Sequence, residues 1–299
     1  MNWKINTLPL LVFLATSGCS STDLTESNNA DYASRKCLAE VDEVMSQSDA
    51  YKFIDLRKPE EYNQGHIKGA VNIWRTQITD TSFAYGGMMP TQIQMETLLG
   101  QLGISATDTV VIYDQKAECD AARLWWVLKF YGHQNIKLLN GGLTEWKASD
   151  GELTTNKSLI NPTDYQFSDQ PDFSILAMFG AIEAQPDEQS LLLDTRGIEE
   201  YSGEFHKKGA AYPGHIEDAL NLDWSSAVDY SGTQKFLNAD ELKQLYAATE
   251  IDGKKPVITY CHSGVRSAHT LFVLTELLGY RNIKNYDGSW IEWSHLHAQ

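Results

Sequence analysis

The sequence predicts an α/β protein with two tandem domains, each a mainly parallel sheet flanked by helices. Short apolar runs typical of buried strands alternate with segments of helical periodicity, and this alternation favours parallel strands covered by helices. The same alternation occurs twice along the chain, in the same order. The length of 299 residues suits two domains, because a domain takes roughly 100–200 residues.

The composition is that of a folded protein and excludes several classes of function. Hydrophobic residues make up 42% of the chain and charged residues 21%, which is ordinary for globular proteins. The formal net charge is −16, and without a long basic run the chain is not expected to bind nucleic acid. Its four cysteines are too few for a disulfide scaffold and lack the paired C-x-x-C spacing of a zinc site.

The first residues predict an export signal rather than part of a domain. A basic residue near the start is followed by the apolar run 8–15, which is far shorter than the roughly 20 residues that span a bilayer. Small residues then precede Cys19, so residues 1–18 resemble a bacterial lipoprotein signal peptide. The resemblance implies that Cys19 becomes the lipidated first residue of the mature protein. An ordinary secretory signal with a chance cysteine is the alternative.

The residues around Cys19 also predict where the protein resides. Ser20, rather than aspartate, follows this cysteine, and in Gram-negative sorting this favours the outer membrane. We therefore expect a soluble body on the periplasmic side of the cell envelope, held to the membrane only by an N-terminal lipid anchor. The polar segment 19–35 predicts a flexible tether between the anchor and the first domain.

The internal repeat indicates two copies of one domain. Residues 65–73 (GHIKGAVNI) match residues 214–222 (GHIEDALNL). The apolar runs that end at Asp114 and Cys261 are each followed by a glycine 18 residues later. Chance similarity would not keep this register through a strand, a loop and a helix.

The boundaries of the two copies follow from this register. Residues 36–150 form the first predicted domain, and residues 172–299 form the second. The segment between them, 151–171, is polar and contains Pro162 and Pro171, which predicts a linker.

Within each copy the predicted elements follow in a regular order. Four apolar runs predict the strands of the first copy: 53–56, 70–73, 110–113 and 136–139. Helical periodicity runs over residues 121–132, where Gly132 would end the helix. In the second copy, the run that ends at Tyr260 corresponds to the third strand. Sites of parallel sheets lie at the carboxyl ends of strands, and Cys261 occupies that position.

The segment CHSGVRS, residues 261–267, is a loop between this strand and a helix that starts near Ser267. The loop amides and the start of the helix would favour the thiolate of Cys261 over the thiol and lower its pKa. Gly264 permits a tight turn, and Arg266 adds a fixed positive charge. A buried structural cysteine at the end of a strand is the alternative.

Together with the repeat, these motifs resemble those of tandem-domain rhodaneses, which are thiosulfate or 3-mercaptopyruvate sulfurtransferases. The resemblance covers nearly all of residues 36–299 and rests on five segments: DTR at 194–196, EEYSGE at 199–204, GHIEDALN at 214–221, VITYCHSGVRS at 257–267 and NYDGSWIEW at 285–293. It implies two rhodanese-like domains, of which only the second keeps a six-residue active loop. In the first domain Asp114 replaces the cysteine, and Cys119 falls opposite Arg266 rather than opposite Cys261.

The resemblance also implies a mechanism. The thiolate of Cys261 would attack the outer sulfur of a small anionic donor such as thiosulfate, release sulfite and carry a persulfide. A thiophilic acceptor, cyanide or a thiol, then takes the sulfur. The loop amides would hold the persulfide, so the predicted site comprises His262, Ser263, Gly264, Val265, Arg266 and Ser267. This chemistry requires neither a metal nor an organic cofactor, and none is expected.

The sequence leaves the choice of donor open. Family members that prefer thiosulfate carry two basic residues after the cysteine, and those that prefer mercaptopyruvate carry small ones; His262 and Ser263 fit neither pattern. Arg196 matches a family arginine that helps to hold the donor, but Glu200 replaces a second arginine four positions later. Basic residues in the segment 203–213 either restore positive charge near the site or form a solvated loop, and the solvated loop is the favoured interpretation.

Several other polar residues are interpreted as structural. His66 and His215 recur in both copies within the motif GHI, which favours a turn histidine over a catalytic one. Asp55 and Asp194 end strands in both copies, and each is expected to pair with the arginine that follows it.

The large aromatic residues and the remaining thiols are also expected to lie in the fold rather than in the site. Five tryptophans are predicted in the core and at the domain interface: Trp125, Trp126, Trp146, Trp290 and Trp293. An oxidising periplasm would allow a disulfide between Cys37 and Cys119, which is a hypothesis only.

Two other functions remain open. A related cysteine phosphatase or arsenate reductase would need a seven-residue Cys-x5-Arg loop, whereas Cys261 and Arg266 enclose only four residues. A tethered sulfur carrier without turnover would keep the same loop, so the sequence does not separate it from an enzyme.

Overall fold

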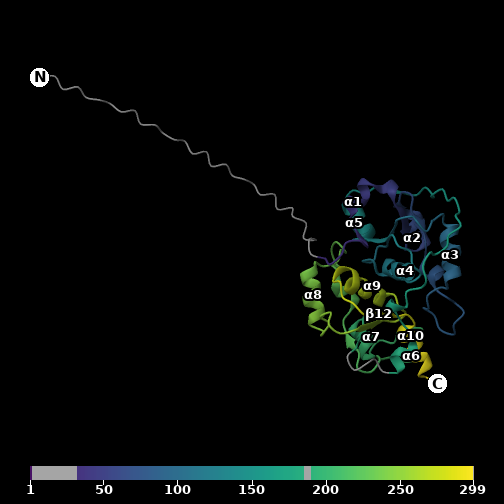
Figure 1. Cartoon of the computed structure of the whole chain (residues 1–299), viewed down its shortest axis with the longest axis vertical. Helices are drawn as coiled ribbons and strands as arrows, with labels where there is room; N and C mark the ends of the chain where they lie inside the picture. The colour runs from purple at the N-terminus through teal and green to yellow at the C-terminus, as the bar shows by residue number, and fades with distance from the viewer. Residues whose placement is uncertain (2–31, 185–189, 299) are drawn as a thin grey trace.

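The computed structural model describes Met1 and residues 32–184 and 190–298. Apart from Met1, the predicted signal peptide 1–18 lies outside the described residues, and so does the predicted lipidation site Cys19. The described chain forms two α/β domains in contact, with α4 (Cys119–Phe130) and α9 (Arg266–Phe272) between them (Figure 1). Among the described residues, no helix is both long enough and apolar enough to cross a membrane.

The first domain has a five-stranded parallel sheet in the order β1-β6-β5-β2-β4. Its strands are β1 (Leu38–Ala39), β2 (Lys52–Asp55), β4 (Val71–Asn72), β5 (Val110–Tyr113) and β6 (Ile136–Leu139). A separate antiparallel pair joins β3 (His66–Ile67) to β7 (Leu153–Thr154). Besides α4, its helices are α1 (Val41–Ser46), α2 (Pro59–Gln64), α3 (Gln92–Gln101) and α5 (Gly142–Ala148).

The second domain repeats this sheet in the order β8-β12-β11-β9-β10, again with all strands parallel. Its strands are β8 (Leu176–Ala177), β9 (Leu191–Asp194), β10 (Leu220–Asn221), β11 (Val257–Tyr260) and β12 (Ile283–Tyr286). Besides α9, its helices are α6 (Phe179–Glu183), α7 (Ile198–Ser202), α8 (Ala239–Ala247) and α10 (Ser289–Leu296), and a π-helical turn at Val273–Leu277 continues α9. Short 3-10 turns lie at Ser48–Ala50, Arg75–Ile78, Phe173–Ile175 and Trp224–Ala227.

The two sheets match strand for strand, which confirms the predicted fold class. Asp55 lies beside Tyr113 in the first sheet, and Asp194 lies beside Tyr260 at the equivalent place in the second. The predicted helix over 121–132 begins two residues earlier, at Cys119. The buried carboxyl end of β11 places Cys261 at the start of the loop that precedes α9, as the pattern of the chain predicts.

Packing between the domains centres on α4 and α9. All residues of α4 except Lys129 are buried, so this helix has no solvent-facing stripe. Trp125 meets Phe272 of α9 edge to face, with ring centroids 4.9 Å apart. Trp126, Trp146 and Trp290 are buried as well, in agreement with the prediction, while Trp293 is half-buried.

Two predicted connecting segments pack more closely than polar composition indicates. Tyr32, placed in the predicted tether, is buried, and its hydroxyl donates to the carbonyl of Leu237 at 2.8 Å. The predicted linker 151–171 contributes β7 and buries Tyr165, whose hydroxyl lies 2.7 Å from Nδ1 of His133. In each case an aromatic side chain gains burial that outweighs the polar character of its neighbours.

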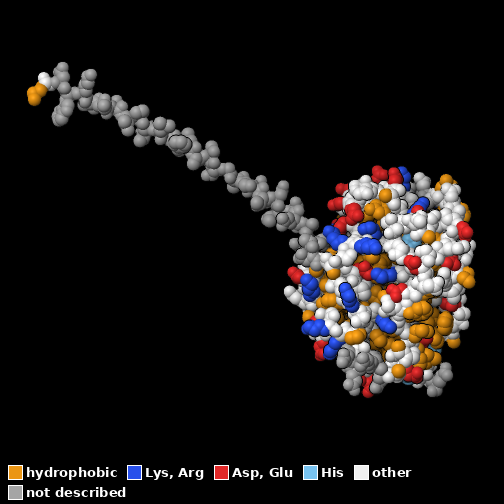
Figure 2. Space-filling model, viewed as in Figure 1, with side chains coloured by type: hydrophobic (Ala, Val, Ile, Leu, Met, Phe, Trp, Pro, Cys, Tyr) orange, Lys and Arg blue, Asp and Glu red, His pale blue; other side chains and the backbone are white. Residues whose placement is uncertain are grey.

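Surface charge is unevenly distributed despite the net charge of −16. On the face seen in Figure 2, Lys and Arg side chains gather toward the side of α8, and exposed apolar side chains gather toward the side of α10. The acidic excess therefore does not exclude local regions of positive charge.

Candidate active site

Cys261 lies at the carboxyl end of β11 and is 1% exposed. Burial alone would raise the pKa of its thiol, but the pKa is lowered to about 7 because several groups stabilise the thiolate. These groups are the guanidinium of Arg266, the hydroxyl and amide of Ser267, and the amide of Ser263. The predicted loop therefore supplies both the fixed charge and the amides that a thiolate requires.

Ser289, which lies outside the loop, holds the loop backbone in place. The hydroxyl of Ser289 accepts from the amides of Cys261 and Gly264, at 3.1 and 3.0 Å, and donates to the carbonyl of Tyr286. The amide of Gly264 thus donates to Ser289, which corrects the prediction that every loop amide serves the sulfur. Ser289, at the start of α10, was not predicted as a site residue, although it lies within the motif NYDGSWIEW.

Arg266 is held by an ion pair with Glu200. Its two terminal nitrogens contact the two carboxylate oxygens at 2.5 and 3.0 Å, and both side chains are largely buried. Although burial raises the pKa of Glu200, the pair with Arg266 lowers it below the ordinary value, so the carboxylate is charged at neutral pH. The pair spans 66 residues of sequence. The family resemblance leads us to expect an arginine at position 200. Its replacement by an acidic residue is the feature of the sequence that indicates a role for Glu200 in the site.

The comparisons with known proteins agree with this geometry. The family model of the rhodanese-like domain matches residues 39–149 and again residues 180–296. The chain belongs to the rhodanese family. Its two sheets are two rhodanese domains in tandem, as the resemblance in the sequence implied.

Relatives extend over nearly the whole chain. A proposed thiosulfate sulfurtransferase from Mycolicibacterium smegmatis is 38% identical over 92% of this chain and 94% of its own. Another from Haloferax volcanii is 36% identical over 90% of this chain and 96% of its own. A solved structure of the 3-mercaptopyruvate sulfurtransferase SseA from Escherichia coli is 25% identical with a TM-score of 0.73, over 85% of this chain and 98% of that one. These findings make the chain a rhodanese-type sulfurtransferase.

The segment 203–213 of the second rhodanese domain reaches the active loop. His262 is neutral, because burial and Lys207 lower its pKa to about 4, and its Nε2 donates to the carbonyl of Lys208 at 3.1 Å. This bond ties the segment to the loop. Residues 204–209, Lys207 included, are exposed, which agrees with the favoured interpretation of a solvated loop. The positive charge of Lys207 is nevertheless close enough to interact electrostatically with Arg266 and Cys261, and after desolvation Arg266 contributes to lowering the pKa of Lys207.

Arg196 has the same partners as an arginine of the first rhodanese domain. It contacts both oxygens of Asp194 and donates to the carbonyl of Gly214 at 2.7 Å. Arg57 makes the equivalent contacts with Asp55 and with the carbonyl of Gly65. This confirms the predicted Asp–Arg pairs. Because the pair also occurs in the domain without the nucleophile, it favours a structural role for Arg196 over the predicted contact with the donor.

The two GHI histidines also behave alike. Nδ1 of His66 lies 2.9 Å from the carbonyl of Tyr62, on whose ring the imidazole stacks, and His215 repeats both contacts with Tyr201. The structural interpretation of both histidines is therefore confirmed.

The matching loop of the first rhodanese domain is occupied by its own side chain. The carboxylate of Asp114 accepts from the amides of four residues, at 2.7–3.0 Å: Lys116, Glu118, Asp120 and Ala121. This is the position of Cys261 in the second domain. An internal anion thus fills the place where a thiolate would be, which agrees with the predicted loss of activity in this copy.

The other thiols do not take part in this site. Burial, followed by the charge of Asp120, raises the pKa of Cys119 well above its ordinary value, so it is a poor nucleophile. Cys37 and Cys119 are both free thiols, which contradicts the suggested disulfide. The physical reason is distance along α4: Cys119 is its first residue, whereas Cys37 lies near Trp125 and Lys129, six and ten residues further on. Within residues 32–184 and 190–298, no cluster of His, Cys, Asp or Glu is arranged to hold a metal ion.

The first rhodanese domain forms one wall of the active site. Gly87 lies so close to Ser263 that a Cβ at this glycine would be 2.6 Å from the Ser263 Cβ. The amide of Met89 donates to Asp287 at 2.8 Å, and the hydroxyl of Tyr85 donates to Glu292 at 2.7 Å. The segment 85–89 therefore covers the loop, and the nucleophile lies at the domain interface.

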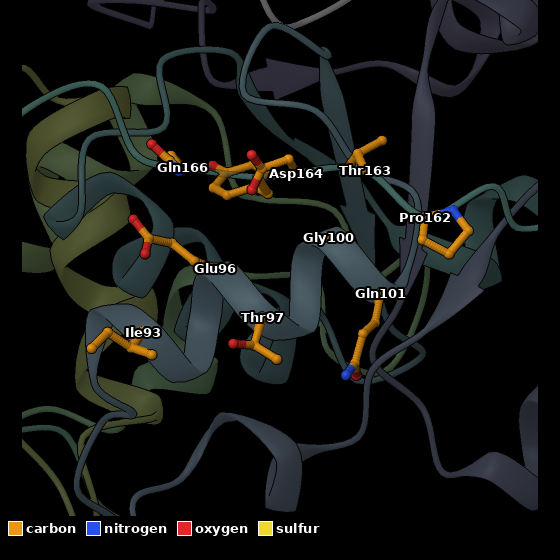
Figure 3. A pocket seen from close by; sticks show the side chains of 10 residues that line it. Ile93, Glu96, Thr97, Gly100, Gln101, Pro162, Thr163, Asp164 and Gln166 are labelled. Atoms are coloured by element: carbon orange, nitrogen blue, oxygen red, sulfur yellow. The ribbon is translucent and has the colours of Figure 1, made fainter.

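A cavity of about 320 Å³ lies elsewhere, between α3 and the linker (Figure 3). Glu96, Thr97 and Gln101 of α3 face Thr163 and neighbouring linker residues across it. None of the residues that line this cavity belongs to the loop of Cys261. The chemistry of the site is thus located by its thiolate and its amides rather than by this cavity.

Proposed function

We propose that this rhodanese transfers a sulfane sulfur from thiosulfate to a thiophilic acceptor through a persulfide on Cys261. In the first step the thiolate attacks the outer sulfur of thiosulfate, an S–S bond forms at Cys261, and the S–S bond of the donor breaks to release sulfite. In the second step cyanide or a thiolate attacks the outer sulfur of the persulfide, and the Cys261 thiolate is regenerated. Atoms and charges balance without a metal or redox cofactor.

The observation that carries this proposal is the pKa of Cys261. With a pKa of about 7, roughly half of the thiol is ionised at neutral pH, whereas an ordinary cysteine has only a few per cent of thiolate. The same loop groups that stabilise the thiolate would stabilise the persulfide anion, which carries the same charge one sulfur atom further out.

The choice of thiosulfate rests on charge and on the relatives. The charge of Arg266 is shared with Glu200 and that of Arg75 with Asp120, so Lys207 is the further cation within electrostatic reach of Cys261. Such a group suits an anionic donor. The relatives at 36–38% identity are proposed thiosulfate sulfurtransferases. SseA is instead a 3-mercaptopyruvate sulfurtransferase, and 3-mercaptopyruvate is therefore the second donor to test.

Steady-state formation of thiocyanate from thiosulfate and cyanide tests the activity. Cys261→Ser should abolish it, and the matched variant Cys119→Ser should retain it. Mass spectrometry after treatment with thiosulfate should find one added sulfur atom on the peptide that contains Cys261. Full activity of Cys261→Ser would refute the mechanism, and stoichiometric persulfide without turnover would favour a sulfur carrier. Parallel assays with 3-mercaptopyruvate measure donor preference.

We also propose that the protein is a lipoprotein of the cell envelope, anchored through Cys19 to the outer membrane and facing the periplasm. The support is the signal-like sequence of residues 1–18, with small residues before Cys19 and Ser20 after it. Metabolic labelling with a fatty acid should label the wild type and leave Cys19→Ser unlabelled. Recovery of unlabelled wild type from the soluble periplasmic fraction would contradict the anchor.

A further inference from the structure

Arg123 of the first domain reaches the catalytic loop of the second. It lies one turn into α4, is 2% exposed and forms a 2.6 Å ion pair with Asp287. Its guanidinium also donates to the carbonyls of Gly264, at 3.3 Å, and Gly87, at 3.0 Å. All three partners border the loop of Cys261, so a residue from the domain without a nucleophile touches the machinery of the domain that has one.

Every contact of this guanidinium is positional rather than catalytic. Burying an arginine costs several kcal/mol unless its donors and its charge find partners. The carboxylate of Asp287 neutralises the charge, and its second oxygen accepts from the amide of Met89 at 2.8 Å. Arg123 therefore has a fixed orientation, and its low exposure keeps it from direct contact with a donor in solvent.

Holding a carbonyl also orients the amide that follows it. In a trans peptide the C=O and the next N–H point in opposite directions. Two loop carbonyls are held by α10 of the same domain, since Cys261 accepts from the amide of Trp290 and His262 accepts from that of Ile291. The amide that follows the His262 carbonyl is that of Ser263, which stabilises the Cys261 thiolate. Because the His262 carbonyl points toward α10, the amide of Ser263 points in the opposite direction, toward the sulfur of Cys261.

The carbonyl of Gly264 is also held by hydrogen bonds from outside the loop, but the donors do not belong to α10. It accepts from Asn285 of its own domain, at 3.2 Å, and from Arg123 of the other. The amide that this orients belongs to Val265, the last loop residue before Arg266. Gly264 has a φ of +73°, a conformation that glycine changes at little cost, so its peptide needs an external hold more than its neighbours do.

The contacts across the interface are not symmetric. Thr270 of α9 occupies the position that matches Arg123 of α4, counting from Cys261 and Asp114. The first domain's loop is held by the carboxylate of Asp114 and, from the second domain, by Gln234, whose Oε1 accepts from the amide of Ala117 at 3.3 Å. At this matched position an arginine therefore occurs only on the helix that reaches the loop of Cys261.

We propose that Arg123 is a positioning residue for sulfur transfer, which sets the amide cradle of Cys261 from the neighbouring domain. The proposal rests on the proposed sulfurtransferase function, and it makes the domain without a nucleophile part of the catalytic unit.

The test compares Arg123→Gln and Arg123→Lys with Arg57→Lys in the full-length chain. Arg57 belongs to an equally buried Arg–Asp pair of the same domain and does not touch the loop, so its variant controls for lost stability. Both Arg123 variants should lower kcat for thiosulfate by at least about 10-fold with little change in KM. Arg123→Lys retains a positive charge that can pair with Asp287. If Arg123→Gln does not fold, the comparison is made with Arg123→Lys alone.

A second readout is independent of turnover. The rate of Cys261 alkylation by iodoacetamide, measured against pH, should have a midpoint near 7 in the wild type and in Arg57→Lys. The midpoint should move to higher pH in the Arg123 variants, because the loop amides then stabilise the thiolate less well. A folded Arg123 variant with the wild-type kcat and midpoint would overturn the proposal, as would an equal loss of kcat in Arg57→Lys. Absence of thiocyanate formation by the wild type would instead refute the proposed function, while the alkylation profile still reports on Arg123.

Discussion

Replacement of Ser267 by alanine should raise the pKa of Cys261 and slow sulfur transfer at neutral pH. Ser267 is fully buried at the start of α9, and its hydroxyl and its amide both stabilise the thiolate. Because no solvent reaches this position, water cannot replace the lost hydroxyl. Among the described residues the hydroxyl has no other hydrogen-bond partner, so it is available to donate to the thiolate, and the substitution removes this donor while leaving the amide in place.

The magnitude follows from the strength of such a bond. A hydrogen bond to a charged group contributes about 1.5–3 kcal/mol, which corresponds to roughly 1–2 pKa units. The pKa of Cys261, about 7 in the wild type, should therefore rise to roughly 8–9 in Ser267→Ala. At pH 7 the thiolate fraction then falls from about one half to between about 1% and 10%, so the first half-reaction should slow by about 5- to 50-fold.

The assay is the rate of Cys261 alkylation, or of sulfite release in a single turnover, measured from pH 5.5 to 9.5, a range chosen to extend roughly 1.5 units below pKa 7 and above pKa 8. The wild-type rate should rise about tenfold between pH 6 and 8, since ionisation with a pKa of about 7 increases the thiolate over this interval. Ser263→Ala is the matched control, because Ser263 acts through its amide and keeps it in the variant. A midpoint that stays near 7 in Ser267→Ala, or that moves equally in Ser263→Ala, would refute this account of the thiolate.

Three further predictions concern neighbouring positions. Glu200→Gln removes the partner of Arg266 and frees its charge for the donor, so the KM for thiosulfate should fall by about tenfold, equivalent to about 1.4 kcal/mol; an unchanged or higher KM in steady-state assays would contradict this. Gly264→Ala places a Cβ 2.6 Å from the carbonyl of Asp287 at a φ of +73°, so thermal unfolding should begin at lower temperature and activity should be lost; wild-type behaviour in both measurements would argue against the close approach. Burial and Asp120 raise the pKa of Asp114 to about 6, so the wild type should lose stability as the pH rises from about 4 to 6; Asp114→Asn lacks this group and should lose less stability over the range while keeping the nucleophile, and an unchanged pH dependence of unfolding in urea would contradict this.

Much of the fold could be predicted because the chain contains it twice. The register from Asp114 to Gly132 recurs from Cys261 to Gly279, and this recurrence fixes the equivalent strands and the loop that carries the nucleophile. The shared motif GHI also identified His66 as structural. A feature present in both copies serves the fold, since only one copy has the cysteine.

The same argument could have been applied to Arg196, whose counterpart Arg57 has identical partners in the first domain. It could not have found Arg123, because Arg123 and the carbonyl of Gly264 are 141 residues apart and meet only when the domains dock. The pair of Glu200 with Arg266 likewise depends on how α7 lies against the loop. Contacts that arise from docking leave no periodicity and no local motif in a single sequence.

The carboxylate of Asp114 makes the two domains differ in how their loops are occupied during the catalytic cycle. The first domain keeps the amides of its loop occupied at all times, because the covalently attached side chain of Asp114 accepts from them. In the proposed reaction the second domain acquires a terminal sulfur from a donor and loses it to an acceptor in every cycle. The loop of the first domain therefore has one occupant throughout turnover, whereas the loop of Cys261 alternates between two.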